Sequence, residues 1–173
     1  DKKELIKKLK SLNLDLIVIG PEIPLANGLS DLLRENNFKV FGPNKDGARL
    51  EYSKSWAKEF MQNADIPTAK FWKVKSLSEA EKVINKLNSD PVVVKADGLA
   101  SGKGVFIPES KDECLQVTEE IFNGKFGNAG EVVVLEEKIE GPEVSIFALC
   151  DGEKYILLPT AQDHKRLNEN DKG

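Results

Sequence analysis

A short apolar run that leads into a glycine-rich loop constrains this chain more than any other feature. Consecutive valines in residues 91–95 predict a buried strand that ends at Lys95. A loop with three glycines and Lys103 follows, and the apolar pattern resumes over residues 105–107. Glycines let the backbone approach a ligand closely, and backbone N–H groups beside two ammonium groups suit a polyphosphate. The segment therefore predicts strand, loop and strand, with the loop folding over phosphates.

Two better-known phosphate loops do not fit this segment. A Walker loop has the spacing G-x-x-x-x-G-K-[ST], whereas Gly98 and Gly102 are closer together and Gly104 follows the lysine. A dinucleotide-binding loop opens a helix and carries a further glycine, and this segment continues as a strand instead. The alternative is a long hairpin turn with solvated lysines. The adjoining segments favour phosphate binding.

The first third of the chain has the alternating pattern of an α/β protein. A lysine-rich amphipathic helix is predicted over residues 1–14, followed by parallel strands at residues 15–19 and 38–41 around a helix at residues 25–36. Apolar side chains then recur every four residues from residue 48 to residue 64, which predicts one helical stripe with Trp56 and Phe60 in the core. Ser53 is a candidate N-cap within it.

The alternation continues to residue 158. Strands are predicted at residues 71–74, 91–95, 105–107 and 131–137, with helices at residues 76–87 and 110–122. Two further strands, at residues 143–150 and 155–158, are predicted to form a hairpin around Asp151 and Gly152. Residues 161–173 are polar and without periodicity, which indicates an exposed loop.

Composition excludes several classes of function. In 173 residues, 25 Lys and Arg against 29 Asp and Glu give a net charge of −4, which argues against nucleic-acid binding by the whole chain. The basic segment 2–10 is interpreted as a solvated helix face. Two cysteines and one histidine exclude a disulfide framework and a Cys/His metal cluster. Cys114 and Cys150 are predicted to be reduced, buried thiols, and no apolar run approaches the ~20 residues of a membrane span.

A second polar motif follows the strand at residues 131–137. This strand ends at Glu136 and Glu137, and the chain then turns at residues 141–142 and presents Glu143. Exposed backbone groups at such a turn can recognise an adenine edge, and a carboxylate can bind both ribose hydroxyls. A charged β-turn is the alternative for this motif taken alone. Lys54, at a predicted helix start, would by itself be a solvated surface lysine.

Taken in their order along the chain, these segments resemble those of the ATP-grasp superfamily and, within it, those of the glycinamide ribonucleotide synthetase family. The forms K-A-D-G-L-A-S-G-K-G-V at residues 95–105 and Q-D-H-K-R at residues 162–166 are typical of that family. The other matching stretches lie at residues 19–25, 41–43, 53–54, 66–68 and 136–137.

The resemblance implies an α/β (α+β) architecture, an ATP-grasp fold preceded by part of a parallel-sheet domain. Residues 1–48 would be the C-terminal part of that Rossmann-like domain, and residues 49–67 the linking helices. Residues 68–138 would form the ATP-grasp lid subdomain, and residues 139–173 the start of the core domain. The family's N-terminal strand has no counterpart here, and whole enzymes of the family are longer. We therefore expect this segment to be inactive alone.

The resemblance also assigns roles to single residues. Lys54 and Lys95 would hold the ATP phosphates, and Glu143 would bind the ribose. Glu22 would face 5-phosphoribosylamine. The mobile lid would comprise Gly98, Ser101, Gly102, Lys103 and Gly104. The adenine site would comprise Glu136, Glu137 and Ile139, and the substrate side would comprise Asp163, His164, Lys165 and Arg166. The catalytic residues would be Lys95, Lys165 and Arg166.

The reaction implied is the ATP-dependent joining of glycine to 5-phosphoribosylamine, with glycinamide ribonucleotide, ADP and phosphate as products. The ligands of Mg²⁺ or Mn²⁺ are expected after Gly173, with none in this segment. The resemblance further implies a cytoplasmic monomer that binds neither membrane nor nucleic acid. Another ATP-grasp carboxylate–amine ligase and a non-catalytic ATP-binding module are the alternatives.

Overall fold

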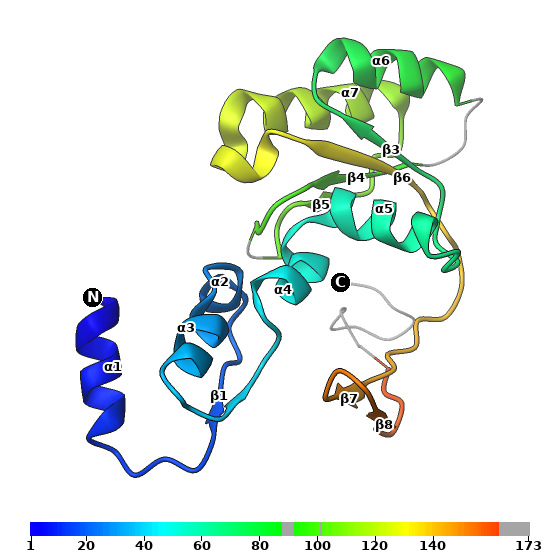
Figure 1. Ribbon diagram of the computed structural model, residues 1–173. Coiled ribbons are helices and arrows are strands. Elements are labelled where there is room, and N and C mark those ends of the chain that lie inside the picture. The colour runs from blue at the N-terminus through cyan, green and yellow to red at the C-terminus, as the bar shows by residue number, and fades with distance from the viewer. Residues whose placement is uncertain (88–91, 101, 163–173) are drawn as a thin grey trace. The chain divides into compact units, whose positions relative to one another are not determined.

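The computed structural model describes residues 1–87, 92–100 and 102–162. Its contacts divide the chain into two units, residues 1–138 and residues 139–173, which we describe separately (Figure 1). Helices and strands both occur, as the alternating pattern predicts. Within the described residues, no helix combines the length and the apolar character needed to span a membrane.

The first unit begins with a small parallel β-α-β arrangement. After α1 (Lys2–Lys10), strands β1 (Ile17–Val18) and β2 (Val40–Phe41) pair in parallel, which confirms the predicted direction. Each strand is shorter than its apolar run. The single predicted helix between them is two helices, α2 (Glu22–Ala26) and α3 (Leu29–Glu35), because Gly28 adopts a left-handed φ of 75°.

The predicted continuous stripe over residues 48–64 is interrupted. Helix α4 (Lys45–Tyr52) ends at Ser53, whose φ of −132° and ψ of 101° are extended, and α5 (Lys54–Asn63) begins there. Ser53 caps α5 as predicted, with Oγ accepting from the Trp56 N–H. Trp56 stacks on Phe60 at a centroid distance of 5.4 Å, but Phe60 is 44% exposed, so its predicted place in the core is wrong. The buried side of this helix carries Ser55 instead.

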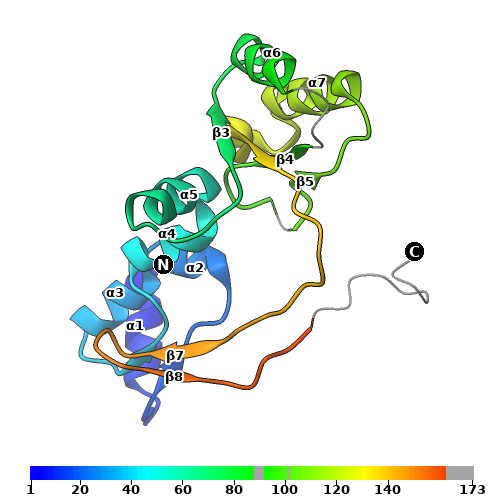
Figure 2. The same ribbon diagram turned by 90° about the vertical axis from the view of Figure 1, so that its right-hand side faces the viewer.

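A four-stranded antiparallel sheet forms the main core of the first unit. Its order is β3-β6-β4-β5, and the strands span Phe71–Val74, Val92–Ala96, Val105–Phe106 and Val133–Glu137 for β3, β4, β5 and β6. Helices α6 (Leu77–Lys86) and α7 (Lys111–Glu120) lie together over one face of the sheet (Figures 1 and 2). A π-helical turn (Ile121–Lys125) and a 3₁₀ turn (Gly127–Gly130) lead from α7 towards β6.

Apolar side chains fill the space between this sheet and its two helices. Val74, Val94 and Leu135 from three strands are at most 1% exposed and join Ile84 and Cys114 from the helices in one cluster. The predicted burial of Cys114 is confirmed. Burial raises the pKa of its thiol to about 11, so the group is neutral at physiological pH.

The second unit consists, in its described part, of a hairpin. Strands β7 (Ala148–Cys150) and β8 (Tyr155–Leu157) pair antiparallel, and Asp151 Oδ1 accepts hydrogen bonds from two backbone N–H groups in the turn, as the predicted hairpin requires. Cys150 is exposed, so its predicted burial is wrong. The side chains of both strands are exposed, because no second layer covers either face within the described residues of this unit.

Leu135 provides a test of the sheet core. Replacing it with Ala should lower the free energy of unfolding by about 2–5 kcal/mol, because the change removes methyl groups from a fully buried site and leaves a cavity. Leu50, which is 50% exposed on α4, supplies the matched control. Urea denaturation of the two variants should separate them clearly, and equal losses would contradict this description of the core.

Candidate nucleotide-binding site

Strand alternation brings Lys95 and Glu136 to the same face of the sheet. Val94 on β4 and Leu135 on β6 point into the core, so their neighbours Lys95 and Glu136 point to the opposite face. Lys95 lies opposite Val134 in the register of the two strands, and Glu136 lies opposite Val93. Lys95 and Glu136 are therefore diagonal neighbours. Their side chains form an ion pair of 2.7 Å between Nζ and Oε2.

Helix α5 contributes a second lysine to the same carboxylate. Lys58 Nζ lies 2.6 Å from Glu136 Oε1 and also donates to Thr68 Oγ1 at 2.7 Å. The side chains of Lys58 and Glu136 are 12% and 11% exposed, whereas that of Lys95 is 24% exposed. Of the two ammonium groups, that of Lys95 is thus the more accessible. The three side chains carry two positive charges and one negative charge.

Electrostatics keep Glu136 ionised. Burial alone would raise the pKa of this carboxyl group, but the hydrogen bonds and charges of Lys58 and Lys95 outweigh burial and lower it below its ordinary value of 4.5. A buried carboxylate with two cationic partners is a stable arrangement, whereas one without them would be costly. The two lysines thus stabilise the charge of Glu136 where the side chain is largely shielded from water.

Asp97 joins the end of β4 to the first turn of α5. Its carboxylate accepts from the Ser55 N–H and, at 3.1 Å, from the Ser53 hydroxyl. Its backbone carbonyl accepts from the Lys54 N–H at 3.2 Å. A carboxylate at a helix N-terminus satisfies N–H groups that the helix leaves unpaired and interacts well with the helix dipole. Asp97 therefore fixes the start of α5 and, with it, the position of Lys54.

The ammonium group of Lys54 lies over the start of the glycine-rich loop. It donates to the carbonyl oxygens of Asp97 at 3.4 Å and Gly98 at 3.2 Å. Burial, assisted by the nearby positive charge of Lys95, lowers the pKa of Lys54, although Asp97 and Glu51 oppose the shift. An anion beside Lys54 would stabilise the charged form of its ammonium group.

Each glycine of the loop is required for a different physical reason. A Cβ on Gly98 would lie 2.8 Å from Ala129 Cα, and its N–H donates to the Ala129 carbonyl at 3.1 Å. A Cβ on Gly104 would lie 2.6 Å from Ala100 Cβ. Gly102 adopts a left-handed φ of 76°, which side chains disfavour. The base of the loop is thus closely packed, and Lys103 is exposed. Ser101 lies outside the described residues.

The other predicted site residues are distributed over the chain. Glu137 is exposed at the end of β6 and pairs with Lys70 through its backbone N–H at 2.9 Å. Glu22 is exposed at the start of α2, directly after the turn that follows β1. Ile139 and Glu143 belong to the second unit. Asp163, His164, Lys165 and Arg166 lie outside the described residues.

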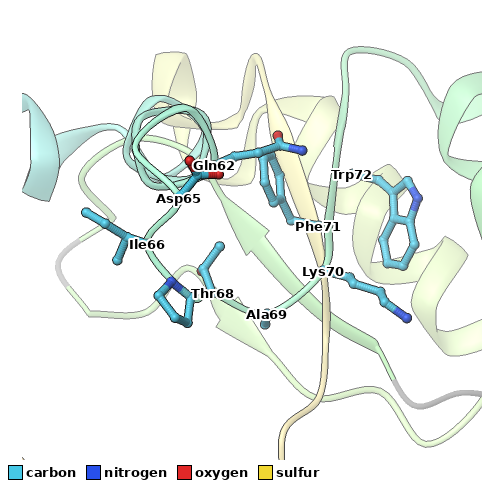
Figure 3. A pocket seen from close by; sticks show the side chains of 9 residues that line it. Gln62, Asp65, Ile66, Thr68, Ala69, Lys70, Phe71 and Trp72 are labelled. Carbon is cyan, nitrogen blue, oxygen red and sulfur yellow. The ribbon is translucent and has the colours of Figure 1, made fainter.

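Two surface hollows lie in the first unit. The larger, of about 510 Å³, is formed by the end of α5, the following loop and the start of β3, and no predicted ATP-binding residue lines it (Figure 3). The smaller, of about 330 Å³, includes Ser53, Asp97 and Gly98. Asp97 and Gly98, whose carbonyl oxygens accept from Lys54, line the smaller hollow, whereas Thr68, which accepts from Lys58, lines the larger. We therefore place the candidate site by its chemistry rather than by size.

Sequence reasoning assigned no role to Lys58 or Asp97. Lys58 follows Lys54 by one helical turn, and this spacing was the available signal. Asp97 stands inside the K-A-D-G motif, but its contact with α5 depends on a fold in which distant segments meet.

The Asp97 contact predicts a measurable loss of stability. Asp97→Ala should lower the free energy of unfolding by about 1–2 kcal/mol, the usual cost of losing an N-terminal helix cap. Asp46→Ala, an exposed acidic residue in the first turn of α4, is the control and should cost less. Thermal or urea unfolding measures both. Equal costs would mean that the carboxylate of Asp97 does not anchor α5.

The lowered pKa of Glu136 predicts a pH dependence. Its folded pKa lies below the unfolded value, so it contributes stability above pH 4.5, and this contribution is lost as the pH falls from 4.5 through the folded pKa. Glu136→Gln should therefore destabilise by about 3 kcal/mol near neutrality. The difference between Glu136→Gln and wild type in the free energy of unfolding should become smaller at acidic pH.

Urea denaturation over a pH series measures this difference. Glu59→Gln is the control, because it removes the acidic partner of Lys73 from an ion pair that is much more exposed. Its difference from wild type should be small at every pH. A Glu136→Gln penalty that stays constant into acid would contradict the assignment.

Comparison with known protein families accounts for the whole chain in two parts. Residues 1–51 match the model of the phosphoribosylglycinamide synthetase N domain, and residues 52–173 match the model of its ATP-grasp (A) domain. A phosphoribosylamine–glycine ligase of Nostoc is 49% identical over 91% of this chain and 37% of its own length. One from Leptospira interrogans is 47% identical over 100% of this chain and 41% of its own. The chain thus spans about two fifths of these relatives.

Solved structures share the fold. The phosphoribosylamine–glycine ligase of Thermotoga maritima matches with a TM-score of 0.80 and 38% identity, over 96% of this chain and 41% of that protein. A biotin carboxylase from Campylobacter jejuni matches with a TM-score of 0.74 and 20% identity, over 91% of this chain and 36% of that protein. At this identity the second similarity concerns the fold alone. The predicted ATP-grasp architecture is confirmed by the match of residues 52–173 to the ATP-grasp (A) domain.

Proposed function

This chain belongs to the phosphoribosylglycinamide synthetase family, and on that basis we propose that the protein carrying it joins glycine to 5-phosphoribosylamine with ATP. The products are glycinamide ribonucleotide, ADP and phosphate. The observation that supports this most directly is that Lys54 Nζ donates to the Gly98 carbonyl at the base of the glycine-rich loop, which follows Lys95 at the end of β4. Two cations beside a loop whose glycines admit close approach suit a triphosphate.

Within this proposal, the residues divide by the part of the reaction that they serve. Lys54 and Lys95 hold the phosphates, and the loop closes over them as a lid. The adenosine end is bound by the segment from Glu136 to Glu143, and Glu22 faces 5-phosphoribosylamine. The lid residues are Gly98, Ser101, Gly102, Lys103 and Gly104; the adenosine-site residues Glu136, Glu137, Ile139 and Glu143; and the substrate-side residues Asp163, His164, Lys165 and Arg166.

The chemistry requires activation of a carboxylate. Glycine carboxylate is a poor electrophile, and transfer of the γ-phosphoryl group to it breaks the bond to ADP and forms glycyl phosphate, an acyl phosphate with a good leaving group. The amine of 5-phosphoribosylamine then attacks the acyl carbon and releases phosphate. Lys54 and Lys95 reduce the cost of gathering negative charge, and Lys165 and Arg166 act on the substrate side. A closed lid would keep water from the acyl phosphate.

The described residues do not fit a divalent metal site. No group of three or more His, Cys, Asp or Glu side chains in the described ranges could hold an ion. We therefore derive no step through Mg²⁺ or Mn²⁺, and propose that its ligands come from sequence beyond Gly173.

The domain organisation belongs to the same proposal. Residues 1–48 are the end of a Rossmann-like domain, residues 49–67 link it to the ATP-grasp lid at residues 68–138, and the core domain begins at residue 139. The protein acts as a monomer in the cytoplasm. Another ATP-grasp ligase is not favoured, because the curated relatives described above are named phosphoribosylamine–glycine ligases.

Lys95→Ala tests the nucleotide site. It should weaken ATP binding by about tenfold or more, because it removes the more accessible cation of the site and leaves Glu136 to repel phosphate. Titration calorimetry on the full-length protein measures the effect. Lys82→Ala, an exposed lysine on α6, is the control and should bind ATP normally. Undiminished affinity in Lys95→Ala would refute the site.

An assay of acceptors tests the reaction itself. The full-length protein should form ADP with glycine and 5-phosphoribosylamine together, and should not do so when formate or bicarbonate replaces glycine. ATP turnover with one of those acids in place of glycine would assign the protein to a different ligase.

A further inference from the structure

Lys58 is a nearly buried lysine for which the proposed reaction has no use. It lies in the middle of α5, one helical turn after Lys54, and its side chain is 12% exposed. A lysine is rarely this buried without a partner, and Lys58 has two, the carboxylate of Glu136 and the hydroxyl of Thr68. Both partners belong to the protein and take two of the three N–H donors of its ammonium group.

The contact with Glu136 matters because Glu136 also holds Lys95. With Lys95 as its sole partner, the carboxylate would cancel the charge of the lysine that the proposed function assigns to the phosphates. The second ammonium group binds the other oxygen, at 2.6 Å against 2.7 Å for Lys95, so the carboxylate is shared. The three groups together carry a net charge of +1. Without Lys58 that net charge falls to zero.

We propose that Lys58 is a positioning residue of the nucleotide site, which shares the carboxylate of Glu136 and so leaves Lys95 oriented and with net positive charge for a triphosphate. This inference rests on the proposed function. It adds that the affinity for phosphate depends on a lysine that touches no phosphate. Because α5 also begins with Lys54, one helix then sets both phosphate-binding cations.

The test is Lys58→Met in the full-length protein, because methionine keeps most of the side-chain length and removes the charge. The KM for ATP should rise about tenfold, and any loss of kcat should be smaller than that rise, because Lys58 acts through Lys95 on the binding of the phosphates. The loss of affinity should be largest for ATP, smaller for ADP and smallest for AMP, because it comes from charge at the phosphates.

The matched control is Lys73→Met. Lys73 on β3 pairs with Glu59 on α5 at 2.9 Å, so it is also a lysine–glutamate ion pair between this helix and this sheet, but a more exposed one. Its removal should leave the KM for ATP unchanged. A Lys58→Met variant that behaves like Lys73→Met would overturn the proposal, as would equal losses for ATP, ADP and AMP.

A double variant separates charge from general damage to the fold. In Lys58→Met/Glu136→Gln, the carboxylate is gone as well, and Lys95 again gives a net charge of +1. Because Glu136 also belongs to the proposed adenosine site, Glu136→Gln alone is the reference. The double variant should bind ATP as tightly as Glu136→Gln, since no carboxylate is left for Lys58 to share. A double variant that binds ATP clearly more weakly than Glu136→Gln would mean that Lys58 is structural only. Wild-type protein that fails to use ATP with glycine would instead refute the proposed function.

Discussion

Glu136 carries a carboxylate on the sheet face opposite α6 and α7, where burial opposes its charge. Two lysines from different elements make this position possible, Lys95 on the neighbouring strand and Lys58 on α5. The contact with Lys58 fastens the helix to the sheet, and the contact with Lys95 orients the side chain that emerges beside the glycine-rich loop. Fold and candidate site therefore depend on the same ion pairs.

The end of β4 is fixed in a similar way by Asp97. Its carboxylate caps α5, and its carbonyl oxygen, with that of Gly98, accepts from Lys54. On the other side of the loop base, Gly98 packs against Ala129 in the 3₁₀ turn. The loop thus departs from a strand end that is held on two sides. A phosphate-binding loop benefits from such an anchor, because a rigid base limits the entropy lost when the loop closes.

Much of this fold could be predicted from patterns of local sequence. In β4, Lys95 follows three consecutive valines, and in β6, Glu136 follows Val133, Val134 and Leu135, so the sequence predicts two buried strands that end at charged residues. The strand order could not be predicted in the same way, since nothing in either strand specifies its neighbour. For that reason Lys95 was predicted to bind phosphate, but its pairing with Glu136 was not.

The two wrong predictions of burial, for Phe60 and Cys150, also arise because local sequence does not specify tertiary packing. Every-fourth-residue periodicity across residues 48–64 hides the extended conformation of Ser53, which changes the direction of the helix and leaves Phe60 exposed. Cys150 was predicted to be a reduced, buried thiol like Cys114, yet the sequence does not say whether a second layer covers its strand.

The role proposed for Lys58 could not be predicted from the sequence and depends on contacts that only the structure shows. By spacing alone it is one of the two lysines of α5, and Lys73, on the adjoining strand, is equally plausible from sequence. The structure distinguishes them by burial and by partner: Lys58 shares the carboxylate of Glu136 with Lys95, the proposed phosphate-binding lysine, whereas Lys73 pairs with Glu59 at the surface. Exposed ion pairs contribute little to stability, whereas breaking a buried one is costly. The same pair of residue types therefore has different consequences at two positions along one helix.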